Sequence, residues 1–156
     1  MVPSWHNLAE PHSFIAMSFG AGLVPFSPGT AGALVAVPMA WVILKLPVAL
    51  QAGAVVIFFL VGIFCAEHFG KRFENHDHPA IVWDETVATL AVLLLSPVQP
   101  LAWLAGLIAF RFFDIAKPWP ISWVDRHVRG GIGVMSDDLA AALPAVAAVH
   151  LLTRLY

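Results

Sequence analysis

Apolar residues along this chain occur in long runs that are separated by proline-containing breaks and by two polar segments. The longest run, 48–66, has Gln51 as its only strongly polar residue, and it is about as long as a helix must be to cross a bilayer core. Another run, 31–44, precedes it, is interrupted by Pro38 and ends at the break Lys45-Leu46-Pro47. Because this break turns the chain, the two runs predict a helical hairpin over residues 30–66.

The second half of the chain follows the same pattern. The break 96–100 contains two prolines and separates two apolar runs, which predicts a second hairpin made of helices 79–95 and 101–115. A final apolar run, 139–152, predicts a further helix. The predicted fold class is therefore all-α: a multi-pass membrane helical bundle with about five membrane helices, including two hairpins. We expect residues 1–156 to form a single domain.

The two hairpins determine which segments meet. A single span over 86–110 would put the polar segments 67–85 and 111–138 on opposite faces, whereas two hairpins put both on one face together with the Gly- and Pro-rich entry 19–34. That entry forbids a regular helix until about Thr30, which we expect to cap the helix that follows. Six of the eight Lys and Arg residues lie on the shared face. Because positive charge favours the cytoplasmic side, this face is predicted to be cytoplasmic.

Composition supports a membrane protein. Hydrophobic residues make up 60% of the chain and the mean hydropathy is +0.82, against an apolar share of about 45–50% in soluble domains. A net charge of −2 argues against a nucleic-acid-binding surface. Cys65 is the only cysteine, which excludes a disulfide framework and a Cys-rich metal site. The N-terminus lacks a basic start followed by an apolar core, so no cleaved signal peptide is expected.

Charged residues are concentrated in the segment 111–138, which holds eight of the 18 Asp, Glu, Lys and Arg residues. Charges beside apolar segments are costly and persist mostly where they carry function. Acids and bases next to Gly130, Gly131 and Gly133 indicate a site for an anion, with a divalent metal as one way of holding it.

Carboxylates in the two polar segments are the candidate catalytic groups. Mg²⁺ takes oxygen ligands, usually a few carboxylates with water and substrate phosphate. The adjacent acids Asp84-Glu85 and Asp137-Asp138 are each expected at the start of an apolar helix. For these pairs, stabilisation of the helix dipole is the alternative to a catalytic role. The candidates are Asp77, Asp84, Glu85, Asp114, Asp137 and Asp138.

Basic residues and one threonine are the candidate anion-binding groups. Arg111, Asp114 and Lys117 have helical spacing and share one face; an intrahelical salt bridge is the alternative. Arg126 and Arg129 precede the glycines and are suited to clamp a phosphate, or else they bind anionic lipid headgroups without chemistry. The substrate-binding candidates are Thr30, Arg111, Lys117, Arg126 and Arg129.

Other metal and phosphate chemistries find no support in the sequence. His76-Asp77-His78 lacks a third His or Cys at a zinc-ligand spacing, and its histidines are more simply polar loop residues. The chain has no DxDxT motif, no Cys followed six residues later by Arg, no Walker-type lysine motif and no CDP-alcohol phosphotransferase pattern.

Three blocks of the chain resemble a known family. FGAGLVPFSPGTAGAL (19–34), HDHPAIVWDETV (76–87) and FRFFDIAKPWPISWVDRHVRGGIGVMSDDLAA (110–141) closely resemble phosphatidylglycerophosphatase A, a bacterial membrane lipid phosphatase. The blocks cover about 60 residues in the family's order. The resemblance implies a multihelical fold and Mg²⁺-dependent hydrolysis of phosphatidylglycerophosphate to phosphatidylglycerol and phosphate, at the cytoplasmic face of the bacterial inner membrane. The partners would be this phospholipid and the membrane.

The resemblance extends to individual residues that match the family's motifs. It covers Pro28, Gly29, Thr30, Gly32, Asp77, Asp84, Glu85, Asp114, Lys117, Pro118, Asp125, Arg126, Gly130, Gly131, Gly133, Asp137 and Asp138.

On this basis we expect four carboxylates to hold the metal, Asp84, Glu85, Asp114 and Asp138, with Asp77 and Asp137 as helpers or general base. Whether water or an aspartate attacks phosphorus stays open. The alternative function is a non-enzymatic ion-coupled carrier or lipid-binding membrane protein that uses the same charges. A carrier often shows a two-fold repeat and mid-span charges, and neither is visible in the sequence.

Overall fold

The computed structural model describes residues 3–155, and this part of the chain is helical with no β-strand. This confirms the predicted all-α class. The elements are the 3-10 helices η1 (Trp5–Ala9) and η2 (Ser18–Leu23) and the α-helices α1 (Pro11–Ala16), α2 (Pro28–Ile43), α3 (Val48–Arg72), α4 (Trp83–Leu95), α5 (Pro100–Ala116), α6 (Ile121–His127) and α7 (Gly130–Thr153).

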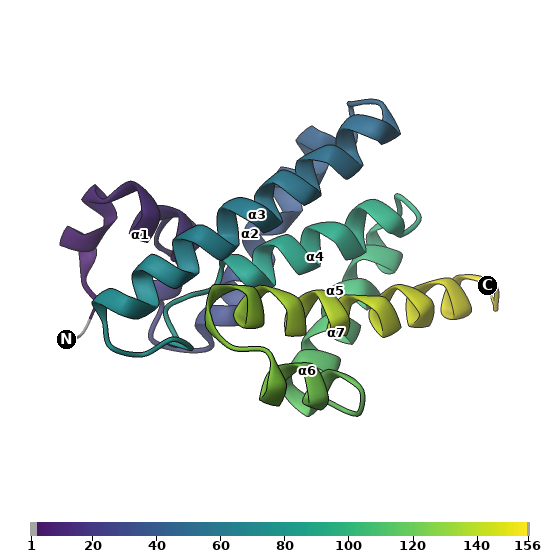
Figure 1. The fold of residues 1–156 in the computed structure, drawn as a ribbon. Helices are drawn as coiled ribbons and strands as arrows, with labels where there is room; N and C mark the ends of the chain where they lie inside the picture. Colours follow the sequence, from purple (N-terminus) through teal and green to yellow (C-terminus); the bar gives the residue numbers. More distant parts are fainter. Residues whose placement is uncertain (1–2, 156) are drawn as a thin grey trace.

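Both predicted hairpins are present. Helices α2 and α3 are joined by residues 44–47, and α4 and α5 by residues 96–99. In the first turn, the Gln51 side chain donates a hydrogen bond of 2.8 Å to the carbonyl of Leu46. Figure 1 shows the two turns at one end of the bundle together with the C-terminus, while α6 and the C-terminal end of α3 lie toward the other end.

Helix α4 is the centre of the bundle and contacts α2, α3, α5 and α7. Nine of its 13 residues are buried. Leu90 and Leu93 pack against Ala36 and Ala40 of α2. Small residues on α2 let the two backbones approach, an arrangement also common between the helices of membrane proteins. The first turn of α4 is thereby held inside the protein.

Two helices, α3 and α7, are long and apolar enough to cross a membrane among the residues the structure describes. Much of α3 is exposed, including Val56, Ile57 and Leu60, as expected of a surface in contact with lipid. Helices α2, α4 and α5 have 16, 13 and 17 residues. At 1.5 Å per residue they reach roughly 20–26 Å, which is less than a hydrocarbon core of about 30 Å. Five membrane helices therefore stay a prediction.

Helix boundaries differ from expectation at three helix starts. Helix α2 begins at Pro28 with Ser27 as its N-cap, so Thr30 lies inside the helix. Helix α4 begins at Trp83, four residues later than expected. The largest difference is in α7, which begins at Gly130 rather than at residue 139. Its glycines are not a loop.

A tertiary contact explains the early start of α7. The N–H of Gly131 donates a hydrogen bond of 2.8 Å to Oε2 of Glu67 on α3, and this carboxylate satisfies a backbone donor that the helix start leaves free. A side chain at Gly131 would collide with the carbonyl of Ile63. Because α7 starts here, Asp137 and Asp138 lie two turns inside it, which excludes helix capping as their role.

Candidate active site

Residues from all three sequence blocks line one pocket of about 240 Å³ at the polar end of the bundle. The prediction that these segments share a face is therefore confirmed within the described structure. The lining residues are Ser27, Pro28, Gly29, Asp77, His78, Pro79, Ile81, Asp84, Glu85, Arg111, Asp114, Lys117, Asp137 and Asp138.

Three carboxylates form the centre of this pocket. Asp84 and Glu85 lie in the first turn of α4, and Asp138 lies on the neighbouring helix α7. One oxygen from each falls within 4.8 Å of the others. Asp84 is 8% exposed and Asp138 is 4% exposed, so water screens their mutual repulsion poorly.

The carboxylate trio, Asp84, Glu85 and Asp138, fits a divalent cation. Asp84 Oδ1, Glu85 Oε2 and Asp138 Oδ2 are buried and have no hydrogen-bond partner among residues 3–155. Burying like charges without a partner is expensive, and a cation would offset that cost. Oxygen-only ligands match the preference of Mg²⁺. Three of the four predicted metal ligands therefore meet in a suitable arrangement.

The fourth predicted ligand, Asp114, lies in the same pocket but outside the trio. Its Oδ2 forms an ion pair with Nη1 of Arg111, three residues earlier on α5. The same nitrogen lies 3.6 Å from Oε1 of Glu85. The intrahelical ion pair considered from the sequence therefore exists, and it also joins α5 to the carboxylates on α4.

Lys117 ends α5 in a left-handed conformation with φ 40° and leaves the helical row of Arg111 and Asp114. Its ammonium group donates hydrogen bonds to Asp125 Oδ1 at 2.5 Å and Asp137 Oδ2 at 2.6 Å. Burial alone would lower the pKa of Lys117, but these two carboxylates raise it above its usual range. The hydrogen bond from Lys117 in turn lowers the pKa of Asp125. Lys117 is thus a permanently charged group at the edge of the pocket.

A second, larger pocket of about 500 Å³ adjoins the first. Asp77 and Asp137 line both pockets, so the two pockets lie side by side, and together we call them the cleft. The other residues around the second pocket are Glu67, His76, Asp125, Val128, Arg129, Gly130, Gly133 and Val134.

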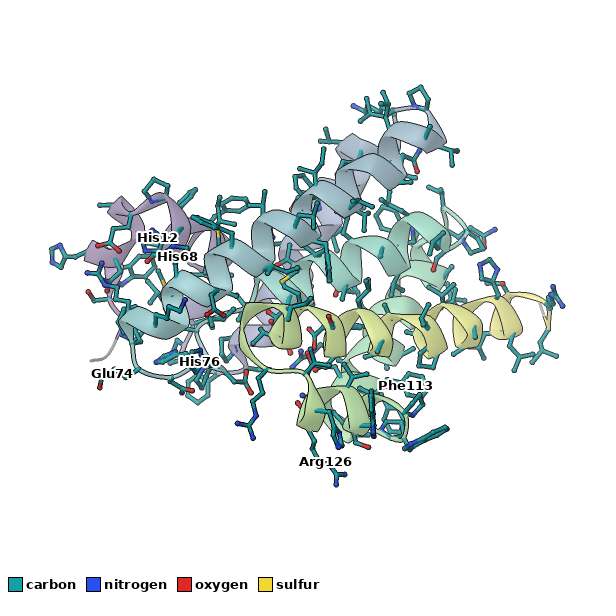
Figure 2. All side chains as sticks on the ribbon, viewed as in Figure 1. His12, His68, Glu74, His76, Phe113 and Arg126 are labelled. Atoms are coloured by element: carbon teal, nitrogen blue, oxygen red, sulfur yellow. The ribbon has the colours of Figure 1, made fainter. Side chains whose placement is uncertain are left out.

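The five predicted substrate-binding residues are divided by the fold. Arg111 and Lys117 line the first pocket and Arg129 lines the second. Thr30 is exposed, and its hydroxyl is 2.7 Å from that of Ser27. Arg126 is exposed on α6 and extends away from the bundle (Figure 2). Thr30 and Arg126 line neither pocket.

At the start of α2, the residue that lines the pocket next to Pro28 is Gly29 rather than the predicted Thr30. A methyl group at this position would collide with Oε1 of Glu85 and lie 2.8 Å from Nη1 of Arg111. Glycine is therefore required for the backbone of α2 to approach the charged groups. Its place in the Gly-rich block was visible in the sequence, but this contact was not.

Three residues around the cleft were not among the predicted site residues. Asp125 shares the Lys117 ammonium group with Asp137, and Glu67 binds the start of α7. His78 lines the first pocket; its Nδ1 accepts a hydrogen bond of 3.1 Å from the N–H of Ala80, and burial lowers its pKa. The adjacent His76-Asp77-His78 run was the available signal for His78, but its spacing indicated only a polar loop.

Fold and site together define an all-helical protein in which a carboxylate cluster suited to a hard cation lies beside fixed cations. This combination is suited to chemistry on a phosphate group.

Comparisons with known proteins agree with this class. The family model described as "Phosphatidylglycerophosphatase A" matches residues 14–153, and the chain belongs to this family. It is accordingly an enzyme, a phosphatase acting on phosphoric monoesters.

Named relatives cover most of the chain. A phosphatidylglycerophosphatase A of Escherichia coli is 38% identical over 138 residues, which are 88% of this chain and 80% of the relative. One of Haemophilus influenzae is 38% identical over 148 residues, 92% of this chain and 89% of the relative. A Bacteroides thetaiotaomicron protein with the provisional name phosphatidylinositol-3-phosphatase is 36% identical over 139 residues, 83% of this chain and 85% of the relative. No solved structure matches the chain significantly.

Proposed function

We propose that the protein hydrolyses the terminal phosphate of phosphatidylglycerophosphate in a Mg²⁺-dependent reaction, giving phosphatidylglycerol and inorganic phosphate. The observation that carries this proposal is the trio of partnerless buried carboxylates beside Arg111 and Lys117, in a chain whose relatives carry the name of that activity. A phosphate monoester brings negative charge that cations must balance. The cleft offers a carboxylate site suited to a metal cation and two basic side chains, Arg111 and Lys117.

Asp84, Glu85 and Asp138 would hold the metal, with Asp114 close enough in the pocket to join them if Arg111 turns toward substrate. When bound, Mg²⁺ would withdraw charge from the phosphate oxygens and orient the ester. Mg²⁺ usually keeps several waters and binds through few carboxylates plus phosphate, so three protein ligands are sufficient.

Arg111 and Lys117 would bind the phosphate oxygens that do not face the metal. Each already lies between carboxylates, which fixes the cation in place before substrate arrives. Such preorganised charge is the main contribution of a protein to phosphoryl transfer. The N-terminal end of α2 adds the backbone N–H of Gly29 at the positive end of a helix dipole, because Pro28 has no N–H and those of Thr30 and Ala31 bond to the Ser27 carbonyl.

In the route that we propose, a water molecule attacks phosphorus while the bond from phosphorus to the glycerol oxygen breaks. The water loses a proton and the leaving oxygen gains one. Asp77 is the better general base of the two predicted helpers, because it is exposed at the junction of the two pockets and has no cationic partner within the described structure. Asp137 is held by the Lys117 ammonium group.

The cleft would open at the cytoplasmic face of the bacterial inner membrane. Most of the Lys and Arg residues belong to the cleft end: Lys71, Arg72, Arg111, Lys117, Arg126 and Arg129. The other end has Lys45 and Arg154. This asymmetry follows the positive-inside rule. Trp119, just before α6, and Trp123, on α6, are exposed. Tryptophan prefers the membrane–water interface, so these side chains support a headgroup-level position for the cleft.

Phosphate release from phosphatidylglycerophosphate by the purified protein in detergent tests the proposal. Release should require Mg²⁺, stop with chelator, and fall by about 100-fold or more in Asp84→Asn, because removal of a preorganised charge typically costs that much. Activity that persists in chelator, or in correctly folded Asp84→Asn, would contradict the metal assignment. Phosphatidylinositol 3-phosphate should be included as a competing substrate because of the Bacteroides relative.

A further inference from the structure

The second pocket has no assigned role, although it is about twice the size of the first. A lipid with a terminal phosphate monoester and a bridging glycerol also carries a phosphodiester, which links the glycerol to the diacylglycerol. The first pocket has cations and a metal-type site for the monoester. The diester is a second negative charge, and it must lie somewhere along the same cleft.

Arg129 is the basic residue that this second charge would meet. Among the residues the structure describes, it is the only Lys or Arg lining either pocket that forms no ion pair with a carboxylate: Arg111 is paired with Asp114 and Lys117 with Asp125 and Asp137. An unpaired guanidinium group has its five donors free for a phosphate, which it can bind in a bidentate manner.

Three of the four carboxylates that line the second pocket form ion pairs with lysines rather than with Arg129. Glu67 lies 3.0 Å from Nζ of Lys71 and also accepts the hydrogen bond of Gly131. Asp125 and Asp137 share Lys117. The remaining carboxylate, Asp77, lines both pockets and forms no ion pair with Arg129 within the described residues.

We propose that the second pocket binds the glycerol phosphodiester part of the lipid and that Arg129 pairs with the diester phosphate. Arg129 is then a specificity-determining residue: it favours lipids that have two phosphates separated by a glycerol over lipids that have a monoester alone. This inference rests on the proposed function for the identity of the lipid. The pocket, the unpaired arginine and the junction at Asp77 and Asp137 are independent of it.

Arg126 provides a matched control. It lies three residues before Arg129 at the same end of the molecule, is also exposed and forms no ion pair within the described residues, but it lines neither pocket. Removal of either arginine lowers the positive charge of this face equally. A difference between Arg129→Ala and Arg126→Ala therefore measures the pocket rather than general attraction to an anionic surface.

The first experiment measures binding and does not need turnover. Short-chain phosphatidylglycerol, which has the diester and no monoester, is titrated by calorimetry into the full-length protein in detergent. We expect Arg129→Ala to bind it about 10-fold more weakly than Arg126→Ala, the lower end of what a charged hydrogen bond contributes. Arg129→Lys should recover part of the affinity. Equal affinities for the two alanine variants would overturn the proposal.

The second experiment compares two substrates with the same variants. For phosphatidylglycerophosphate, Arg129→Ala should raise KM about 10-fold relative to Arg126→Ala with little change in kcat. For short-chain phosphatidic acid, a monoester without the diester, the two variants should have the same KM. A defect of Arg129→Ala that is equal for both lipids would contradict a diester contact. A wild-type protein that releases phosphate from neither lipid would contradict the proposed function instead, and the binding experiment would still decide the role of Arg129.

Discussion

The two ends of the helical bundle differ in how their polar side chains are hydrogen-bonded. At the hairpin-turn end, three uncharged polar side chains bond to backbone carbonyls: Gln51 to Leu46 at 2.8 Å, Ser96 to Val92 at 2.7 Å, and His150 to Leu95 at 2.8 Å. Among the described residues, the buried indole nitrogen of Trp103 has no partner there. At the cleft end, Asp84, Glu85 and Asp138 are buried with oxygens that have no partner. One end is built for stability and the other for binding.

The difference shows that the packing of the bundle compensates for an unfavourable arrangement of charges at the site. The apolar helices packed around α4 hold the three carboxylates together, although the carboxylates repel one another. A bound cation would offset that repulsion. Functional sites commonly retain such locally unfavourable groups, which the rest of the fold compensates. Substitutions at the two ends should therefore separate activity from stability.

The largest effect is expected at the centre of the carboxylate trio. Asp138→Asn should lower phosphatase activity by about 100-fold or more, because it removes a charge that the metal requires. In chelator, the same variant should unfold at a higher temperature than wild type, because one of three mutually repelling carboxylates is gone. Mg²⁺ should raise the unfolding temperature of wild type more than that of the variant. Thermal unfolding and phosphate release measure both quantities.

Glu74→Gln is the control for Asp138→Asn. Glu74 is exposed and lines neither pocket, so loss of its charge should leave the response to Mg²⁺ unchanged. If Asp138→Asn instead lowered stability in chelator and kept the response to Mg²⁺, the carboxylates would not form a repelling cation site.

An intermediate effect is expected at Gly29, where the backbone of α2 meets Glu85 and Arg111. Gly29→Ala should lower activity by about 10-fold or more, because the added methyl group displaces charged groups that must be positioned closely. Gly53→Ala, on α3, adds the same methyl group where no atom lies within 4 Å. It should leave activity unchanged and stabilise the helix by up to about 1 kcal/mol. Equal activity of the two variants would show that the α2 contact is unimportant.

The smallest effect is expected at the hairpin-turn end. The Trp41 and Trp103 rings meet edge to face with centroids 5.9 Å apart, an arrangement that contributes about 0.5–1.5 kcal/mol. Trp41→Leu should lower the free energy of unfolding by about this amount and leave kcat and KM unchanged. A marked loss of activity in the folded variant would mean that the two ends are coupled.

Much of the architecture could be predicted because its signals are local. The breaks 45–47 and 96–100 combine proline with polar residues and end the helices before them, whereas the single prolines Pro38 and Pro144 lie inside α2 and α7. Both hairpins, and the meeting of the three polar segments, follow from the two breaks. The start of α7 could not be predicted in this way: a glycine-rich stretch favours a loop on local grounds, whereas a hydrogen bond to Glu67, 64 residues away in sequence, stabilises its first turn.

For the site, the residue types could be predicted but not their partners. The sequence indicated that Asp84, Glu85, Asp114 and Asp138 belong together, yet the structure joins three of them and pairs Asp114 with Arg111. Likewise, helical spacing grouped Lys117 with Arg111, whereas the left-handed end of α5 directs it to Asp125 and Asp137.

By itself, the sequence determined an all-helical chain, two hairpins and a polar end rich in carboxylates and cations, because helix ends and hydrophobic runs depend on nearby residues. Only the tertiary structure decided which charges face one another, that Arg129 is left unpaired beside a second pocket, and that Arg126 points away from it. These outcomes depend on how each helix is rotated and on how closely glycines allow the helices to approach, and no local pattern encodes either.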